Sequence, residues 1–244
     1  MKKSVLLVIK CFMVVGFSKA QITITSADLA SPSTIIKLAN DTLPSVAVGG
    51  SGTNQTWNMA ALLQNTYDTL AFLSAGWVPN ANFPTANVAV HQGSGDAYGY
   101  MISNSDSAVF VGNHATQSYL GTSATVNQLI STDEKIAKFP MNYLDSFTNN
   151  YTTYAKFYYG GTVLGYQVDS VRDFATIKKS VVVDGLGSIT TPLGTFPAIR
   201  TKETKITHDS VDAYIVVIIG AWINAQVTND TTRNYIWWAN GVGY

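Results

Sequence analysis

Residues 181–200 read VVVDGLGSITTPLGTFPAIR, and residues 213–225 read AYIVVIIGAWINA. In both stretches, β-branched runs are separated by short turn sequences, and Gly185 and Gly194 can adopt the positive φ that tight turns need. Strands joined by such short turns pair antiparallel, because parallel pairing requires a long crossover. The region therefore predicts a β-meander with turns at Asp184-Gly185 and at residues 193–195. Its last strand, over residues 216–223, is expected to be buried on both faces.

The rest of the chain consists of similar short segments. Phe147, Tyr151 and Ala155 alternate with polar residues, which predicts a long half-buried strand over residues 146–158. The alternation slips near Ser170, as it does at a β-bulge. Further strands are expected at residues 67–74, 88–92, 97–103, 108–112, 134–139, 164–168, 177–183 and 233–238. The best helix candidate is residues 57–64, of one or two turns, with Thr56 as a candidate N-cap.

This pattern defines the expected fold class. The protein should be all-β and mostly antiparallel, built as a sandwich or as a strongly curved half-barrel, with at most one or two short helices. The sequence shows no linker, no charge run and no internal repeat. Residues 21–244 are therefore expected to form a single β domain, which is a usual size for such a fold.

The N-terminus has the features of a secretory signal peptide. Two lysines precede an apolar segment, and the sequence Ser18-Lys19-Ala20 supplies small residues for a cleavage site after Ala20. We expect residues 1–20 to be removed and the protein to be secreted, to the periplasm, the cell surface or the medium. The second apolar run, residues 213–225, is too short for a transmembrane helix and is interrupted by Gly220 and Asn224. No transmembrane segment is therefore expected after cleavage.

Charge and cysteine content exclude several classes of protein. Cleavage removes four of the 15 basic residues and none of the 15 acidic ones, which leaves a formal charge of −4. A mildly acidic chain without a basic cluster argues against a nucleic-acid partner. The only cysteine, Cys11, lies in the leader. The mature chain can therefore have no disulfide, no thiolate-bound metal and no cysteine nucleophile.

Four motifs together resemble the N-terminal regions of secreted Bacteroidota proteins that end in a sorting domain of the type IX secretion system. They are GGSGTNQTWNM (residues 49–59), KFPMNYLDSF (138–147), GLGSITTPLGTFPAIR (185–200), and YIWW (235–238) with the terminal Gly243-Tyr244. The resemblance implies an exported β module, with the secretion machinery as a partner and no transferable catalytic residues. Members usually continue into a separate sorting module, whereas this sequence stops at Tyr244. The segment PLGTFPAIR (192–200) is also similar to curved-sheet periplasmic proteins of the lipoprotein-carrier kind.

The sequence contains no motif for catalysis, cofactor binding or metal binding. His91, His114 and His208 are widely spaced and form no His-x-His or His-Glu-x-x-His pattern. There is no Gly-x-Ser-x-Gly elbow and no distinctive carboxylate pair. We therefore predict no catalytic, cofactor-binding or metal-binding residues, although a fold can still assemble a serine, a histidine and a carboxylate into a triad.

The tryptophans allow two interpretations, an aromatic binding platform or ordinary core packing. Trp222 lies in the most apolar segment and is expected in the core. Trp237 and Trp238 are adjacent, so a strand would place them on opposite faces.

A further pattern is Asp followed by a hydroxyl residue and then a small or aliphatic one. The resemblance to exported Bacteroidota proteins implies that such tripeptides carry O-glycans, whereas Asp-Ser and Asp-Thr are also natural turn pairs. The candidate glycosylation sites are Thr42, Thr69, Ser107, Ser170, Ser210 and Thr231.

These observations lead to one expected function and two alternatives. The expected function is that of a secreted non-enzymatic module that binds a ligand or surface partner, or displays itself on the cell surface. One alternative is a curved-sheet carrier of a lipid or another amphiphile, which needs a concave apolar pocket. The other alternative is a hydrolase, which needs a histidine bonded to a carboxylate beside a nucleophile in a cleft.

Overall fold

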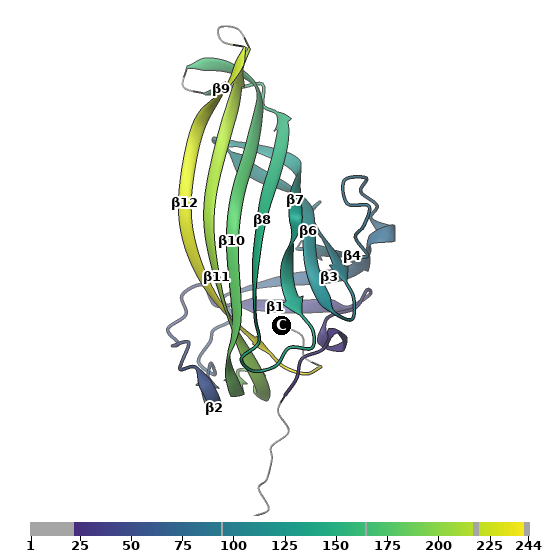
Figure 1. Cartoon of the computed structure of the whole chain (residues 1–244), viewed down its shortest axis with the longest axis vertical. Coiled ribbons are helices and arrows are strands. Elements are labelled where there is room, and N and C mark those ends of the chain that lie inside the picture. Colours follow the sequence, from purple (N-terminus) through teal and green to yellow (C-terminus); the bar gives the residue numbers. More distant parts are fainter. Residues whose placement is uncertain (1–21, 94, 164, 217–219, 242–244) are drawn as a thin grey trace, which may run out of the picture.

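The chain forms one large antiparallel sheet with no α-helix in the described residues (Figure 1). The structure is a computed structural model, and it describes residues 22–93, 95–163, 165–216 and 220–241. The expected all-β, mostly antiparallel fold is confirmed, and it is a single curved sheet, not a sandwich. The leader over residues 1–20, the proposed first residue Gln21 and the terminal Gly243-Tyr244 lie outside the described residues.

The sheet order is β1-β3-β4-β5-β6-β7-β8-β10-β11-β12, and β2 and β9 each pair with β10. The strands of the first half are β1 (Ile35–Asn40), β2 (Gly52–Asn58), β3 (Thr66–Ser74), β4 (Val88–Gln92), β5 (Tyr98–Ser103) and β6 (Ser107–Tyr119). Those of the second half are β7 (Thr122–Lys138), β8 (Ser146–Tyr158), β9 (Thr162–Val163), β10 (Tyr166–Thr191), β11 (Gly194–Ile215) and β12 (Ala221–Trp238). Two 3-10 turns, η1 (Ser26–Asp28) and η2 (Ala75–Trp77), are the only helical segments described.

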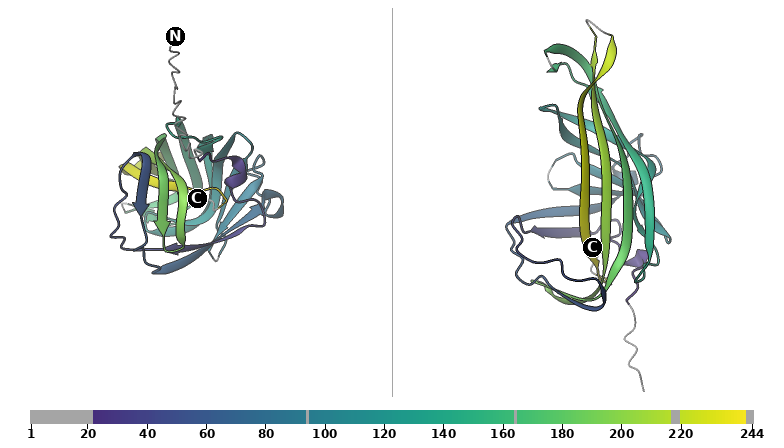
Figure 2. Two further views of the ribbon diagram at one scale, coloured as in Figure 1. Left: turned by 90° about the horizontal axis from the view of Figure 1, so that it is seen from below. Right: turned by 60° about the vertical axis from the view of Figure 1, so that its left-hand side comes forward.

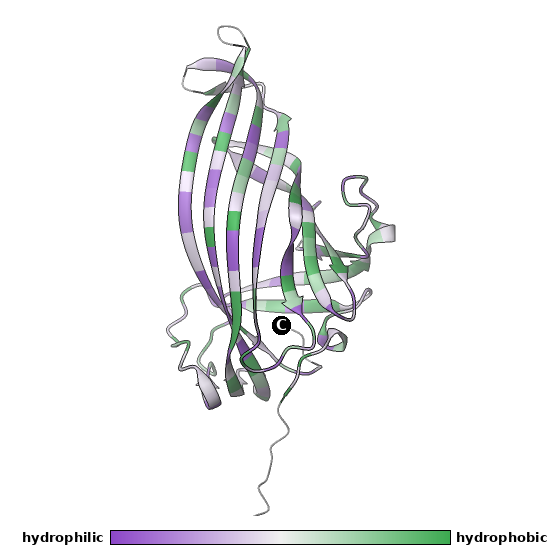
Figure 3. Cartoon of the chain, viewed as in Figure 1, coloured by the Kyte–Doolittle hydropathy of each residue, from purple (hydrophilic) through white to green (hydrophobic). Residues whose placement is uncertain are grey.

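Strands β10, β11 and β12 form the tall, curved wall of the molecule (Figures 1 and 2). β10 has 26 residues, several times the length of an ordinary strand. Between Val171 and Val183 every second residue of β10 is buried, as the alternation of side chains across a strand requires. Colouring by hydropathy shows the same alternation of apolar and polar residues along the wall (Figure 3).

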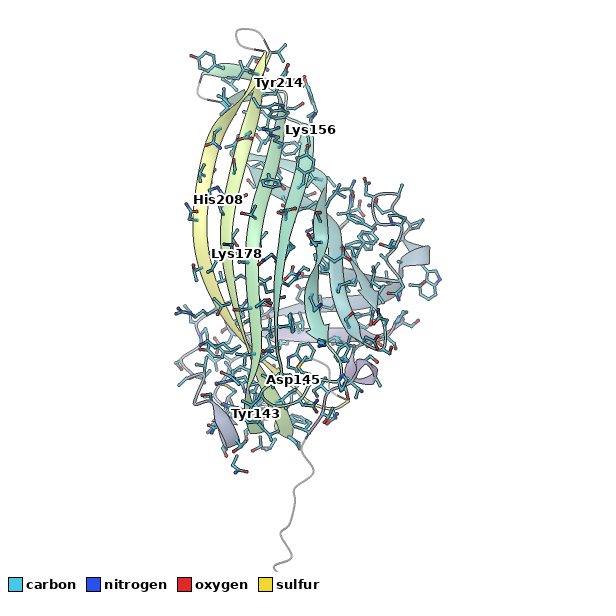
Figure 4. The ribbon with its side chains drawn as sticks, viewed as in Figure 1. Tyr143, Asp145, Lys156, Lys178, His208 and Tyr214 are labelled. Atoms are coloured by element: carbon cyan, nitrogen blue, oxygen red, sulfur yellow. The ribbon has the colours of Figure 1, made fainter. Side chains whose placement is uncertain are left out.

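The described residues form five apolar clusters, and the two largest lie on the buried side of the sheet. The lower cluster is at the end of the wall that carries the β10–β11 turn, and the upper cluster is at the end that carries the β11–β12 turn. The lower cluster contains Ile24, Phe72, Val88, Met101, Ala108, Ala137, Phe139, Met141, Val183, Ile199 and Trp238. The upper cluster contains Tyr119, Val126, Ala155, Val163, Val168, Val171, Val211, Ala213 and Ile215. In Figure 4, Tyr214 and Lys156 mark the upper end, and Tyr143 and Asp145 the lower end.

Several expected elements are confirmed. Residues 146–158 form β8, and β10 shifts register between Val168 and Ser170, where the bulge was predicted. The expected strand at residues 88–92 is β4, and the turn at residues 193–195 falls at the tight connection between β10 and β11.

Three expectations were wrong. Asp184-Gly185 makes no turn, because β10 continues through it with a shift in register between Val183 and Gly185. The expected strand over residues 216–223 includes residues 217–219, which lie outside the described residues. Of the rest, Val216 is 52% exposed and belongs to no strand, Gly220 N donates to Ile215 O at 2.8 Å, and β12 begins only at Ala221. Residues 57–64 form no helix. Trp57 and Asn58 instead complete β2, which pairs in parallel with β10.

A hollow on the concave face

A hollow on the sheet has a volume of about 480 Å³. Its apolar lining includes Leu70, Val90, Met101, Phe110 and Ile136, and its polar lining includes Gln92, Asn113, Gln117, Glu134 and Lys205. We call this cavity the hollow. It therefore offers both apolar side chains and amide and charged groups.

The curvature of the sheet creates the hollow. Leu70 comes from β3 and Lys205 from β11, and six strands lie between these two in the sheet order. Residues that far apart in one sheet can line the same cavity only if the sheet curves until its two ends approach each other. The view from below shows this curvature (Figure 2, left). The hollow accordingly lies on the concave face.

Four charged side chains form an ion network at one wall of the hollow. Lys179 Nζ lies 2.9 Å from Glu134 Oε1 and 2.7 Å from Glu203 Oε2. Lys205 Nζ lies 2.6 Å from the same Glu134 oxygen. Lys179 and Lys205 are direct cross-strand partners in β10 and β11, so their like charges face each other. The two glutamates remove this repulsion and make the network neutral overall.

Burial and charge act against each other at Glu134. Burial alone would raise the pKa of Glu134, but the ammonium groups of Lys179 and Lys205 outweigh it and hold that pKa below its ordinary value. The neighbouring Tyr151 is buried and hydrogen-bonds Glu134, and both effects raise the pKa of its phenol. Glu134 is therefore a firmly ionised group and Tyr151 a neutral hydrogen-bond donor to it. Neither is arranged as a general acid or base near neutral pH.

A second polar group on the same face is the pair Asp173 and Asp209. The two carboxyl groups interact with each other, and Asp173 also interacts with the Tyr119 hydroxyl. Oδ1 of each aspartate is buried without a hydrogen-bond donor in the described residues. Burial, followed by the hydrogen bond and charge of Asp209, raises the pKa of Asp173 to about 7. Asp173 therefore holds a proton below neutral pH, because a buried carboxyl group beside a second carboxyl group ionises only at a large penalty.

The opposite face of the lower wall holds a fully buried arginine. Arg200 Nε and Nη2 donate to the two carboxylate oxygens of Asp184 at 2.8 and 2.9 Å. Its Nη1 donates to the carbonyl oxygens of Val48 and Gly49 at 2.6 and 3.1 Å. The rings of Trp57, Tyr235 and Trp237 surround the guanidinium group, with centroids 5.5, 4.9 and 5.9 Å from Cζ. This arrangement attaches the chain before β2 to the sheet, so its role is structural.

The three histidines are not brought together. His91 Nε2 contacts the carbonyl oxygen of Gly95, and His208 Nδ1 contacts the Asn229 side chain. His114 lies 3.4 Å from the exposed carboxylate of Asp96 through Nε2, but its Nδ1 is bonded to Asn127 Oδ1.

Both nitrogens of His114 are thus occupied by groups that cannot act as nucleophiles. No hydroxyl bonds a histidine within the described part of the chain.

The tryptophans serve the fold. Trp238 lies in the lower cluster, whereas Trp237 packs edge-on against Trp57 at 6.0 Å on the other face, so the expectation of opposite faces is confirmed. The expectation that Trp222 is a core residue was wrong. It is half-buried, with Arg172 Cζ 4.5 Å above its ring, because it begins β12 beyond the turn. Trp77 is 66% exposed and stands alone.

The six candidate glycosylation hydroxyls differ in exposure. Thr42 and Thr231 are exposed, and Thr69, Ser107, Ser170 and Ser210 are half-buried. Ser170 Oγ donates to Asp169 at 2.7 Å and Ser210 Oγ to Asp212 at 3.2 Å, so both hydroxyls are already used within the fold. Glycosylation stays a prediction, with Thr42 and Thr231 the most accessible positions.

The sequence reasoning missed the ion network and the aspartate pair, although the sequence contains a signal for both. Lys179 and Asp173 are in phase with the buried Val171, Ala175 and Ile177. A charged residue in the buried phase of a strand indicates a charged partner across the fold. The partners Glu134 and Glu203 lie 45 residues before and 24 residues after Lys179, and only the tertiary structure brings them together.

Comparison with known proteins gives no assignment, since no family model, no curated protein and no solved structure matches the chain. The described residues also contain no group of three or more His, Cys, Asp or Glu side chains that could hold a metal ion. No helix in this part of the chain has the length and apolar character needed to cross a membrane.

Proposed function

We propose that this protein is a secreted, non-enzymatic binding protein that holds a small amphiphile in the hollow. The observation that carries the proposal is the cavity of about 480 Å³, which is lined by apolar side chains together with a few polar and charged ones. Binding sites for small molecules are usually concave and mostly apolar, with a few placed polar groups, and this volume lies within their usual range. Of the functions considered from the sequence, the curved-sheet carrier requires this feature and the others do not.

The hydrolase alternative has less support. Its requirement is a nucleophile next to a histidine that is oriented by a carboxylate. His114 approaches Asp96, but Asn127 occupies the ring nitrogen that a serine or threonine would need. The firmly ionised Glu134 also lies in a neutral network beside two lysines. Binding without chemistry is therefore the function that these groups favour.

The proposal is tested by filling the hollow. N-phenyl-1-naphthylamine, an apolar dye that fluoresces on leaving water, should bind the purified chain with micromolar affinity. The variant Ala115→Phe places a large side chain on the wall of the hollow and should weaken binding at least tenfold. The variant Ala60→Phe makes the same change at an exposed position and should bind like the unmodified chain. Absence of dye binding, or full binding by Ala115→Phe, would contradict the proposal.

Secretion is a separate part of the proposal, and it rests on the N-terminal sequence. A cell that exports the protein should contain a mature form beginning at Gln21 outside the cytoplasm. Intact-mass measurement of the exported protein checks this, and the same spectrum reveals any O-glycans. A mass that still includes residues 1–20 would contradict signal cleavage, and a mass equal to the bare polypeptide from Gln21 would contradict glycosylation.

A further inference from the structure

Lys205 is the charged group of the hollow that is open to a ligand. The two charged side chains that line the hollow are Glu134 and Lys205. The side chain of Lys205 is 27% exposed, whereas Glu134 is 11% exposed and Lys179 only 1%. A molecule entering the hollow would therefore meet the ammonium group of Lys205 before the rest of the ion network.

A count of donors and acceptors gives the chemistry that Lys205 can recognise. An ammonium group has three N–H donors. Lys205 uses one of them on Glu134 at 2.6 Å, and its other carboxylate neighbour, Glu203 Oε1, lies 3.7 Å away, too far for a hydrogen bond. Lys205 therefore keeps donor capacity.

The glutamates, in contrast, already accept at least two donors each. Glu134 receives both lysines and the Tyr151 hydroxyl, and Glu203 receives Lys179 and the amide of Asn234.

The amides on the wall of the hollow donate to protein groups. Gln92 Nε2 donates to Asp68 at 2.7 Å, Asn113 Nδ2 to Gln128 at 3.1 Å, and Gln117 Nε2 to Asn113 at 3.2 Å. These bonds orient the amides along the wall. Of the donors on the polar wall, Lys205 carries a full positive charge and is the least engaged.

We infer that the ligand of the hollow is an anionic amphiphile, with a carboxylate-type head on Lys205 and an apolar tail against Leu70, Val90, Met101 and Phe110. This inference rests on the proposed function and specifies its ligand class. The ion network by itself is neutral, so an added anion gains the free donor of Lys205 without displacing a bound counter-ion. Hydrogen bonds to charged groups are stronger than neutral ones, which makes the head group selective.

The aspartate pair is the one feature that would favour a cationic head instead. Asp209 lies four residues beyond Lys205 on β11, about 13 Å along the strand. Asp173 also holds a proton below neutral pH, which reduces the charge of the pair. At that distance the attraction is weaker than direct contact with Lys205 and is screened by salt. A preference for a cationic head is accordingly an outcome that the experiment must be able to reveal.

The experiment compares three molecules with the same tail and different heads: dodecanoate, dodecan-1-ol and dodecylamine. Each displaces the fluorescent dye from the purified chain at pH 7.5, below its aggregation concentration. Dodecanoate should bind about tenfold or more tightly than dodecanol, the ratio expected for one charged hydrogen bond. Dodecylamine should bind most weakly.

The variant Lys205→Met keeps the length of the side chain and removes its charge. It should bind dodecanol as before and lose the preference for dodecanoate. The matched control is Lys202→Met, whose position on β11 has the opposite alternation phase and is not on the wall of the hollow. If Lys205→Met does not fold, the order of the three heads on the unmodified chain still decides the question.

The outcomes separate the two proposals. Failure of all three molecules to bind overturns the proposed function and, with it, this inference. Equal binding of the three heads, or tighter binding of dodecylamine, overturns the anionic ligand and leaves the binding function in place. A dodecanoate preference that survives in Lys205→Met overturns the role of Lys205.

Discussion

Arg200 shows how one buried residue holds two parts of the chain together. It is 2% exposed, pairs with Asp184 through two nitrogens, and donates to two carbonyl groups of the segment before β2. A buried guanidinium is tolerated only when it is paired and hydrogen-bonded, and four of the five N–H donors of Arg200 have acceptors here. The same contacts leave Asp184 dependent on Arg200.

We therefore expect Arg200→Met to lower the free energy of unfolding by about 3–5 kcal/mol, because the buried Asp184 carboxylate loses its partner. Urea denaturation followed by tryptophan fluorescence measures this loss. Arg233→Met, at an exposed position in β12, is the control and should change stability by less than about 0.5 kcal/mol. If Arg200→Met lowers the free energy of unfolding by less than about 1 kcal/mol, the pairing of Arg200 with Asp184 does not stabilise the fold as expected.

Asp173 and Asp209 make stability depend on pH. In the folded protein Asp173 keeps its proton up to a pKa of about 7, whereas an aspartate in the unfolded chain loses its proton near the ordinary value of 3.8. Between these values the folded state binds more protons than the unfolded state, so this pair lowers stability as pH rises. The decrease is on the order of 1.4 kcal/mol per pH unit at most, and it ends above about pH 7.

The variant Asp209→Asn should reduce this pH-dependent loss, because an amide has no charge to repel the Asp173 carboxylate and can donate to it, while the burial of Asp173 remains. The groups that face Asp173 are Asp209 from β11 and Tyr119 from β6, and the phenol stays neutral throughout this range. Denaturation at pH 5, 6, 7 and 8 compares the variant with the unmodified chain and with Asp230→Asn, an exposed control. Parallel pH profiles for all three proteins would show that Asp209 does not contribute to the pH dependence.

At the scale of the element, β2 depends on a glycine in its partner strand. A Cβ at Gly187 would lie 1.9 Å from the Gln55 carbonyl oxygen, so no side chain fits between β10 and β2. Trp57 of β2 then packs against the face that holds Arg200. Residues 57–64 were expected to be helical because Thr56 resembled a cap, but pairing with β10 prevails over that local signal.

We expect Gly187→Ala to detach β2 and leave the rest of the sheet folded. Trp57 would become accessible to solvent. Two measurements would detect this exposure: limited proteolysis within residues 44–65 and quenching of tryptophan fluorescence by acrylamide. Gly76→Ala is the control, since the nearest atom to its added Cβ is 3.6 Å away. If residues 44–65 resist proteolysis equally well in Gly187→Ala and in Gly76→Ala, then β2 tolerates the Gly187→Ala substitution.

At the scale of the molecule, the long strands connect the two apolar clusters. β10 and β11 each contribute residues to both, with the ion network and the aspartate pair between them. Ile199 of the lower cluster and Val171 of the upper cluster are fully buried. Unfolding at either end would therefore break strand pairs that continue into the other.

We accordingly expect Ile199→Ala and Val171→Ala each to shift one common unfolding transition. The expected loss is about 2–5 kcal/mol for the isoleucine and somewhat less for the smaller valine. Calorimetry shows the number of transitions, and hydrogen exchange at both ends of β10 shows whether they open together. A second transition that only one of the variants moves would mean that the two ends fold independently.

The local alternation of apolar and polar residues was sufficient to predict the fold class. Alternation placed β8 correctly at residues 146–158, because a half-buried strand repeats every two residues whatever lies around it. It failed at residues 216–223, where continuous apolar character does not show whether a chain turns. It also failed at Asp184-Gly185, where a glycine that could turn instead marks a shift in register.

The sequence by itself determined that this is an antiparallel β protein with an alternating core and no cysteine after Cys11, since these properties depend on composition and on neighbours along the chain. Only the tertiary structure decided that the sheet curves, that β3 and β11 line one hollow, and that Lys179 and Lys205 meet Glu134. The physical reason is that curvature and charge pairing arise between strands far apart in the chain, where no local periodicity specifies the partner.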